Sequence, residues 1–328
     1  MDFALIIREI GRGATGSRDL SRGDAQQLYG AMLDGEVPDV ELGAIAIALR
    51  MKTETVDEMG GFLAAANARL PTLRRPPCGK IRPVVIPTYN GARHNANLTP
   101  LLALLLQRFG VPVLLHGVRD DYGRITSEQV FSEYGLLACG SVQEAQRLID
   151  QRRVAYLPLP LLSPGLDRQL ALRIRLGLRN SAHSLVKMID PFQGDSLLLA
   201  AATHPDYLGS MRALLTGTGA NALLLRGTEG EPFANPKRRP LIEHLHDGVI
   251  DILFEAEHDS LRNLPQLPEH CDAKATVAWM RRVLAGEVSL PLPIANQLAC
   301  CLYACGRASS FHQAKALVAV EGNRLAMV

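Results

Sequence analysis

The sequence predicts an α/β protein in which an N-terminal helical domain, residues 1–72, precedes a larger α/β domain, residues 73–328. Residues 1–70 repeat apolar side chains at helical spacing, whereas the residues that follow alternate short apolar runs with amphipathic stretches. Buried strands that alternate with helices form a mostly parallel sheet with helices on both faces. We therefore expect a mostly parallel central sheet flanked by helices.

The N-terminal domain is expected to consist of helices followed by a linker. One helix is predicted in "DLSRGDAQQLYGAMLDGEV", where Asp19 and Ser21 are favourable N-caps. The segments "DVELGAIAIALRMKT" and "TVDEMGGFLAAANARL" repeat the pattern, and Pro71 ends the second of them. Cations and prolines in "PTLRRPPCGKIRP" then predict the linker. We also expect a helical contribution to this domain from residues near 181–190.

In the α/β domain, apolar runs predict the strands "VVIP", "VPVLLHG", "VAYLPLP", "SLLLAAATH" and "NALLLRG", with "VIDILF" as a further candidate. Helices are predicted between these strands and at the C-terminus: Leu98–Phe109, Ser127–Tyr134, Val142–Arg152, Arg168–Leu178, Ser181–Ile189, Pro205–Leu215 and the segment from Thr276. Ligands of such sheets bind beyond the carboxyl ends of the strands. The loops after "VVIP", "VLLHG", "LPLP" and "LLLRG" are therefore expected to meet at one cleft.

The composition suits a soluble protein of a reducing compartment. The 328 residues are 47% hydrophobic and 21% charged, with a formal net charge of +2. The N-terminus "MDFALIIREIG" does not resemble a signal peptide, and no apolar stretch is long enough to span a bilayer. The six cysteines form no CxxC pair, so buried thiols are expected. We predict a cytoplasmic protein without a membrane partner.

Positive and negative side chains are segregated along the chain. Asp and Glu are absent from Met59 to Arg119 and from Arg168 to Ile189, and acids are concentrated between Glu243 and Asp272. Such segregation either concentrates a polyanion on one face or leaves separate, solvated charge runs. Three cation-rich segments point to the expected cleft. We predict a nucleic-acid-binding groove that contains Arg75, Arg93, Arg119, Arg173, Arg175, Arg179, Lys187, Lys237, Arg238 and Arg239.

Few side chains near the expected cleft are suited to holding a metal. Magnesium in phosphoryl chemistry is usually held by one or two carboxylates. The loop after "LLLRG" has only Glu229 and Glu231 before its cations, and Asp120–Asp121 is either a metal pair or an exposed doublet. His244 and His246 share one face, which is a weak metal signal. We predict no metal site and no cofactor.

The loop "PTYNGARHNANLTP" after the first strand has two interpretations. A phosphate cradle needs several glycines and a helix N-terminus, and this loop has only Gly91 ahead of the predicted helix. Asn97 and Thr99 therefore either cap that helix or bind an anion together with Arg93.

The order of these segments resembles the anthranilate phosphoribosyltransferase family, which shares its fold with the pyrimidine nucleoside phosphorylases. The stretch ending in "KTET" is similar to that family's helical segment, and "NLTP", "LLHGVR", "LRIRLGLRN" and "LLLRGTEGEPF" stand for its NIST, KHGNR, LGIRT and HGxDGxDE motifs. The resemblance covers nearly the whole chain. It implies a TrpD-like fold and a vestigial phosphoribosyl-pyrophosphate site at Asn97, Thr99, His116 and Arg119. Arg173 stands where the family contacts the aromatic acid.

This sequence departs from the family's pattern at the residues that hold the diphosphate. The GTGGD loop is replaced by "PTYNGARH", the lysine of KHGNR by Leu115 and its asparagine by Val118. The family's magnesium-binding aspartate and glutamate fall on Pro232 and Phe233. These departures are similar to those of the YbiB-type proteins, TrpD-like paralogues that bind nucleic acid. That resemblance implies a homodimer joined through the N-terminal helices, a basic groove on each subunit and little sequence preference.

The sequence favours a nucleic-acid-binding protein, more consistent with a non-enzyme than with an enzyme. Its cations would contact phosphates directly. Tyr89 and Tyr122 either stack on unpaired bases or, as is more usual for a single aromatic residue, pack in the core or within their loops. The alternative is an anthranilate-type phosphoribosyltransferase, with magnesium held by Glu229 or Glu231. A protein that binds or senses a small anion is a third reading.

Overall fold

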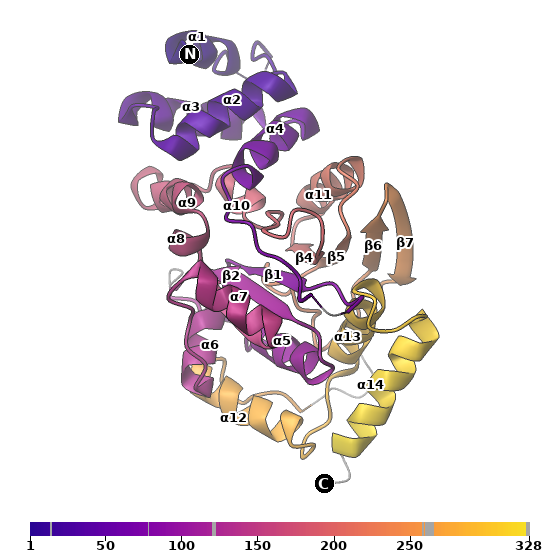
Figure 1. Ribbon diagram of the computed structural model, residues 1–328. Coiled ribbons are helices and arrows are strands. Elements are labelled where there is room, and N and C mark those ends of the chain that lie inside the picture. The colour runs from indigo at the N-terminus through magenta and orange to yellow at the C-terminus, as the bar shows by residue number, and fades with distance from the viewer. Residues whose placement is uncertain (14, 78, 120–122, 258, 260–265, 326–328) are drawn as a thin grey trace. The chain divides into compact units, whose positions relative to one another are not determined.

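The computed structural model describes the chain except for residues 14, 78, 120–122, 258, 260–265 and 326–328 (Figure 1). The chain divides into two compact units. A helical unit combines Met1–Thr72 with Leu159–Pro191, and an α/β unit combines Leu73–Pro158 with Phe192–Val328. The returning segment of the helical unit thus begins at Leu159, well before the residues near 181–190 that the sequence indicated.

The helical unit contains α1 (Phe3–Ile10), α2 (Arg22–Asp34), α3 (Asp39–Lys52), α4 (Val56–Asn67), α8 (Leu159–Leu162), α9 (Pro164–Leu176) and α10 (Ala182–Leu185). Helices α2 and α4 pack closely because Gly61 has no side chain: a Cβ there would lie 2.3 Å from the carbonyl oxygen of Arg22. Beside this contact the rings of Tyr29 and Phe62 stack with centroids 4.7 Å apart. Both side chains are buried, so they form the centre of this unit's core.

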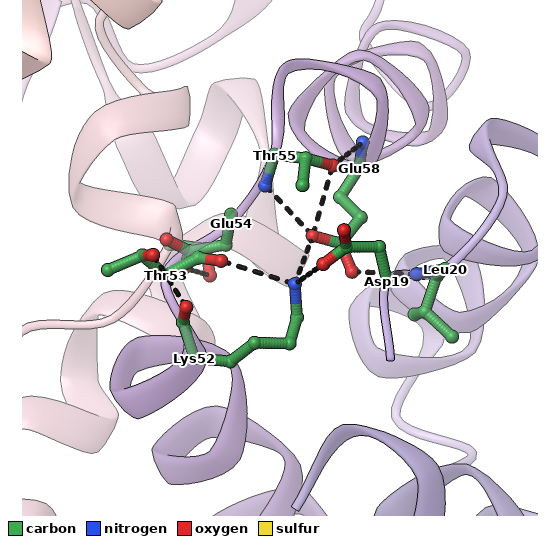
Figure 2. Close-up of polar contacts among 8 residues, drawn as sticks. Asp19, Leu20, Lys52, Thr53, Glu54, Thr55 and Glu58 are labelled. Carbon is green, nitrogen blue, oxygen red and sulfur yellow. Dashed lines mark hydrogen bonds and ion pairs between the residues drawn. The ribbon is translucent and has the colours of Figure 1, made fainter. Parts of the chain in front are cut away.

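A cluster of charged side chains, of which Lys52 and Glu58 are buried, lies at the start of α4, as Figure 2 shows. Thr55 and Glu58 form a capping box, in which each side chain accepts from the other residue's backbone N–H. Glu58 also accepts from Lys52 Nζ at 2.7 Å and from the backbone N–H of Leu20 at 2.9 Å. Lys52 Nζ donates in addition to Asp19 at 2.6 Å. Residues 19–20, Lys52 and Thr55 are therefore joined through Lys52 and the Glu58 carboxylate.

The α/β unit is built on a seven-stranded sheet in the order β3-β2-β1-β4-β5-β6-β7. The strands are β1 (Val84–Thr88), β2 (Val113–Gly117), β3 (Val154–Pro158), β4 (Leu197–Ala202), β5 (Ala222–Arg226), β6 (Ile242–His246) and β7 (Val249–Phe254). Strands β1 to β5 pair in parallel, whereas β6 and β7 are antiparallel. This sheet confirms the predicted fold class. Strand β6 was not predicted, because the polar residues of "IEHLH" interrupt its apolar run.

Helices cover both faces of the sheet: α5 (Thr99–Arg108), α6 (Ser127–Tyr134), α7 (Val142–Asp150), α11 (Pro205–Gly217), α12 (Ala273–Leu284), α13 (Leu292–Ala304) and α14 (Phe311–Leu325). Helices α5, α12, α13 and α14 share one core with strand residues such as Ile86 and Leu223, and α13 and α14 lie side by side (Figure 1). The alternate residues, such as Val85 and Leu224, are buried against the other face, where α7 and α11 contact the strands. None of the described helices is long and apolar enough to cross a membrane.

The strand order places a topological switch at β1. From β1 the chain adds β2 and β3 on one side, and it then returns to add β4 and β5 on the other side. The loops that leave neighbouring strands at such a point diverge and leave a crevice at their carboxyl ends. The loops after β1 and β4 flank this crevice, and the loops after β2 and β5 leave the next strands on either side of it.

Candidate functional site

The loop after β5 folds back onto the loop after β1 through Glu231. This carboxylate is fully buried. One of its oxygens accepts from the backbone N–H groups of Asn90 at 2.8 Å and Gly91 at 2.9 Å. The other accepts from the hydroxyls of Thr88 and of Thr99, the latter at 3.1 Å. Both oxygens thus have donors from the protein itself.

Glu229 makes a second set of contacts with the same loop. Its carboxylate accepts from the backbone N–H groups of Arg93 at 3.2 Å, His94 at 2.9 Å and Asn95 at 2.9 Å, and from the Asn95 side-chain amide at 3.0 Å. Arg124 Nη1 lies 3.5 Å away. Burial on its own would raise the pKa of Glu229, but these hydrogen bonds outweigh it and lower that pKa. Three successive backbone N–H groups thus form a small anion-binding site, and the carboxylate of Glu229 occupies it.

The backbone of the β5 loop is shaped for these contacts. Glu229 and Gly230 both have positive φ, 54° and 92°, a conformation that glycine adopts freely and glutamate rarely. A Cβ at Gly230 would lie 1.6 Å from the side-chain nitrogen of Asn90, so a larger residue would have to displace that side chain as well as adopt a positive φ. The backbone conformation of the loop and the nearby Asn90 side chain therefore account for the glycine in "TEGEPF", and no ligand is needed to explain it.

The two positions that stand for the family's magnesium carboxylates belong to the core. Pro232 and Phe233 are both buried, and Phe233 is fully so. Gln297 on α13 holds this segment by donating to the Pro232 carbonyl at 2.9 Å and accepting from the Ala234 N–H at 2.7 Å. The neighbouring carboxylates already accept protein donors on each oxygen. These residues do not fit a magnesium diphosphate site.

Asn97 and Thr99 are both buried and both bonded within the chain. Asn97 Oδ1 accepts from the backbone N–H of Thr99 at 3.2 Å, and its amide nitrogen donates to the carbonyl oxygen of Ile125 at 3.2 Å. The hydroxyl of Thr99 is engaged by Glu231. The N-cap of α5 is Leu98, which makes no side-chain capping bond, so these contacts decide neither interpretation of the loop: Asn97 and Thr99 are bonded within the chain.

His116 lies at the end of β2 and is fully buried. Its Nδ1 is 2.6 Å from the hydroxyl of Tyr89, and burial lowers the pKa of His116 to about 3. Tyr89 is only 8% exposed, so of its two interpretations packing within the protein is the one that its burial fits. Tyr122 and Asp120–Asp121 lie outside the described residues.

Six of the ten predicted cations belong to the α/β unit. Lys237 and Arg238 are exposed on the β5 loop. Their neighbour Arg239 is held instead: its Nε donates to the Glu255 carbonyl at 2.9 Å, its Nη2 is 3.1 Å from Glu257, and its guanidinium lies 5.3 Å from the ring centre of Phe254.

The other three cations of this unit are on different loops. Arg93 is exposed on the β1 loop, and Arg119, whose side chain is 74% exposed, follows β2 and lies 3.2 Å from Glu128. Arg75 forms an ion pair with Asp195 at 3.1 Å.

The remaining four predicted cations, Arg173, Arg175, Arg179 and Lys187, belong to the helical unit. Arg175 pairs with Asp39 at 2.9 Å, and both side chains are exposed. The backbone carbonyl of Arg179 accepts from Arg50 at 3.0 Å.

The loops after β1, β2 and β5 converge, as the sequence predicted for the carboxyl ends of the strands. Ala92 and Ile125 form a β-bridge between the first two, and Arg124 donates to the Gly91 carbonyl at 3.2 Å. The loop after β3 behaves differently, since it leads directly into α8 of the helical unit. Sequence reasoning missed Asn95, Arg124 and Gln297, which hold the site together. The only signal for Asn95 and Arg124 is their position in loops that follow strands, and Gln297, within α13, has none.

Comparison with known proteins defines the class. Residues 5–69 match the glycosyl transferase family, helical bundle domain. The structure of anthranilate phosphoribosyltransferase (TrpD) from Thermus thermophilus is similar with a TM-score of 0.77 and 22% identity, over 99% of this chain and 95% of that one. The enzyme from Saccharomyces cerevisiae in complex with PRPP and Mg gives a TM-score of 0.72 and 12% identity, over 99% and 96%. The fold is that of TrpD.

Sequence relatives extend this result. Anthranilate phosphoribosyltransferase from Rhodopseudomonas palustris (strain BisA53) is 26% identical over 323 residues, which covers 97% of this chain and 92% of that protein. YbiB from Escherichia coli (strain K12) is 43% identical over 319 residues, which covers 97% of this chain and 99% of YbiB. The chain belongs to the TrpD-like family, together with YbiB.

Proposed function

We propose that this protein binds nucleic acid through phosphate contacts made by the loops at the carboxyl ends of its parallel strands. The observation that carries the proposal is the orientation of charge on the β5 loop. Lys237 and Arg238 are exposed, whereas Glu229 and Glu231 of the same loop are turned inward onto backbone and hydroxyl donors. The loop therefore offers cations to solvent and keeps its carboxylates in the protein. Contacts of this kind follow a phosphate backbone and favour no base sequence.

Phosphoribosyl transfer is disfavoured by the same geometry. A transferase of this fold would need acids free to hold magnesium and backbone donors free to hold a diphosphate. Here the N–H groups from Asn90 to Asn95 that donate to Glu229 and Glu231 are engaged by those carboxylates. The two positions of the family's carboxylates carry Pro232 and Phe233 in the core.

Removing the two exposed charges of the β5 loop tests whether this loop contacts phosphates. The double variant Lys237→Ala, Arg238→Ala is expected to bind single-stranded DNA more weakly for every sequence. Each lost phosphate contact lowers the slope of log affinity against log salt by about 0.7, so the slope should fall by about 1.4. Fluorescence anisotropy at several salt concentrations measures both quantities. Arg239 is left in place because it is bound within the fold.

The matched control removes two exposed cations at the opposite edge of the sheet. Arg147 is in the last turn of α7 and Arg153 immediately precedes β3. Changing both to Ala alters the net charge equally and is expected to leave the slope unchanged. Equal slopes for the loop variant and the wild type would contradict the proposal. Magnesium-dependent release of pyrophosphate from phosphoribosyl pyrophosphate and anthranilate would support the transferase instead.

We further propose that two copies associate through the helical unit. Val40 and Met51 of α3, which are 82% and 72% exposed, line a groove together with Leu176 of α9. Ile174, also on α9, is 75% exposed. Exposed apolar side chains gathered around a groove are typical of protein–protein contact surfaces. A homodimer would present two cationic loops, and two linked sites bind a polymer more tightly than one.

A further inference from the structure

The hairpin of β6 and β7 gathers three side chains of the kinds that bind transition metals. His244 and His246 are two positions apart on β6, so both lie on the same face of the strand. Asp251 on β7 pairs directly with His244 in the antiparallel register and shares that face. One nitrogen from each ring and one carboxylate oxygen all lie within 4.8 Å of one another.

The amide of Asn221 determines which nitrogen of His244 carries the proton. Asn221 donates its Nδ2 hydrogen to the carbonyl oxygen of Ser196 at 2.9 Å, so its Oδ1 is the atom that lies 2.9 Å from Nε2 of His244. An amide oxygen only accepts hydrogen bonds, so Nε2 of His244 carries the hydrogen and Nδ1 carries a lone pair. Metal-binding histidines usually have their second nitrogen fixed by a hydrogen bond in this way.

Nδ1 of His244 is a buried hydrogen-bond acceptor that lacks a donor. The residue is only 8% exposed, and among the described residues this nitrogen has no hydrogen-bond partner. A buried acceptor without a donor is unfavourable. A cation held jointly with His246 and Asp251 would remove that cost.

The other two side chains can adapt to an ion. Nε2 of His246 and Oδ2 of Asp251 are 2.8 Å apart, and their side chains are 32% and 53% exposed. Tetrahedral bonds of about 2.0–2.1 Å place ligand atoms about 3.4 Å apart, so shifts of about 1 Å would complete the geometry. Asp247 adds a carboxylate nearby, which counters the positive charge of Arg82 beside His244.

We propose that His244, His246 and Asp251 bind a transition-metal ion of the Zn²⁺ type, with one coordination position left for water or an external ligand. Two imidazoles and one carboxylate suit zinc, cobalt or nickel, whereas magnesium and calcium prefer oxygen ligands. The hairpin turn lies beside the first residues of β5, at the amino edge of the sheet. This site is therefore separate from the loops proposed to bind nucleic acid.

The test is calorimetric titration of the full chain, without an affinity tag, with Zn²⁺ after treatment with a chelator. We expect about one equivalent to bind with an affinity that falls at least about tenfold in His246→Ala and in Asp251→Asn. The matched control is His204→Ala: His204 is exposed and lies 3.3 Å from Asp206, a similar pair outside the hairpin. Its affinity should equal that of the wild type. Bound Co²⁺ should show four-coordinate visible absorption, which His246→Ala should abolish.

Several results would overturn the proposal. The wild type could bind no Zn²⁺, or both hairpin variants could bind it as tightly as the wild type. Zinc could also bind outside the hairpin, at His270 and Cys271, which are adjacent in the sequence; Cys271 is only partly buried. Loss of binding in Cys271→Ser with full binding in His246→Ala would place the metal there and refute the hairpin site.

Discussion

Glu229 and Glu231 show how far a residue's role depends on distant partners. The sequence marks them as the only acids in the loop after β5, which made them the magnesium ligands of the transferase alternative. The structure gives them donors more than 130 positions earlier in the chain. No local pattern predicts such pairings, since they depend on β1 and β5 being brought together through β4. The loss of the family's carboxylates at Pro232 and Phe233, by contrast, could be predicted from the residue types alone.

Glu229→Gln is expected to lower the free energy of unfolding by about 1.5–3 kcal/mol at neutral pH, because one oxygen of the carboxylate becomes an amide nitrogen that faces N–H donors. The pKa of Glu229 is lowered in the folded protein, so its contribution exists above the unfolded pKa and is lost as pH falls through the folded pKa. The stabilities of wild type and variant should converge in acid. Urea denaturation at several pH values measures this.

Glu133→Gln is the control for that change, since Glu133 is an exposed carboxylate on α6. It should unfold like the wild type across the same pH range. If the free energies of unfolding of the Glu229 variant and the wild type differed by the same amount at every pH, the hydrogen bonds to the ionised carboxylate would not be the cause of the difference.

Elements were predictable where their pattern is local. The parallel strands and α6 fall where apolar runs and N-caps place them, and the capping box at Thr55 is legible from the spacing of "TVDE". Helix α9 begins at Pro164, four residues before the predicted start, because proline is favourable in the first turn. Strand β6 has no local signal of its own. It forms through antiparallel pairing with β5 and β7.

The junction of α3 and α4 depends on Lys52, whose side chain is 4% exposed beside the fully buried Glu58. Burial favours a lower pKa for Lys52, but hydrogen bonds to Asp19 and Glu58 outweigh it and raise that pKa. Lys52→Met leaves Glu58 buried without its cation and should lower the free energy of unfolding by about 3–5 kcal/mol. Chemical denaturation followed by circular dichroism measures the loss.

A double variant separates the ion pair from packing. Glu58→Gln combined with Lys52→Met removes both charges and should recover part of the loss, because no unpaired charge remains. Strictly additive losses would show that the pair is not coupled. Lys274→Met, at an exposed position on α12, serves as the control and should have little effect.

At the scale of the whole molecule, the sequence predicted segregated charge and a mostly parallel sheet, and the sheet is confirmed. The sequence could not predict which cations form bonds within the protein and which are exposed. Arg239 is bound to Glu255, Glu257 and Phe254, while Lys237 and Arg238 beside it are exposed. That distinction arises from the path of the chain after β7, which brings residues 255–257 back to the loop.

If two copies associate through the helical unit, changing one exposed side chain there should halve the mass of the particle in solution. Val40→Glu places a charge in an apolar contact and should convert a dimer to a monomer in size-exclusion chromatography with light scattering. Leu137→Glu is the matched control, because Leu137 is also 82% exposed but belongs to the α/β unit. A wild type that is monomeric at every concentration, or equal dissociation by both variants, would contradict the proposal.

The packing of Phe233 has a consequence for the history of the fold. Restoring the aspartate and glutamate at positions 232 and 233 would put two charges where a phenyl ring and a proline now fill the interior against α13. Neither reversion would be tolerated alone, because each buries an ionised group before a metal can compensate for it. A magnesium carboxylate pair at positions 232 and 233 would therefore require the loop and the supporting helix α13 to change together.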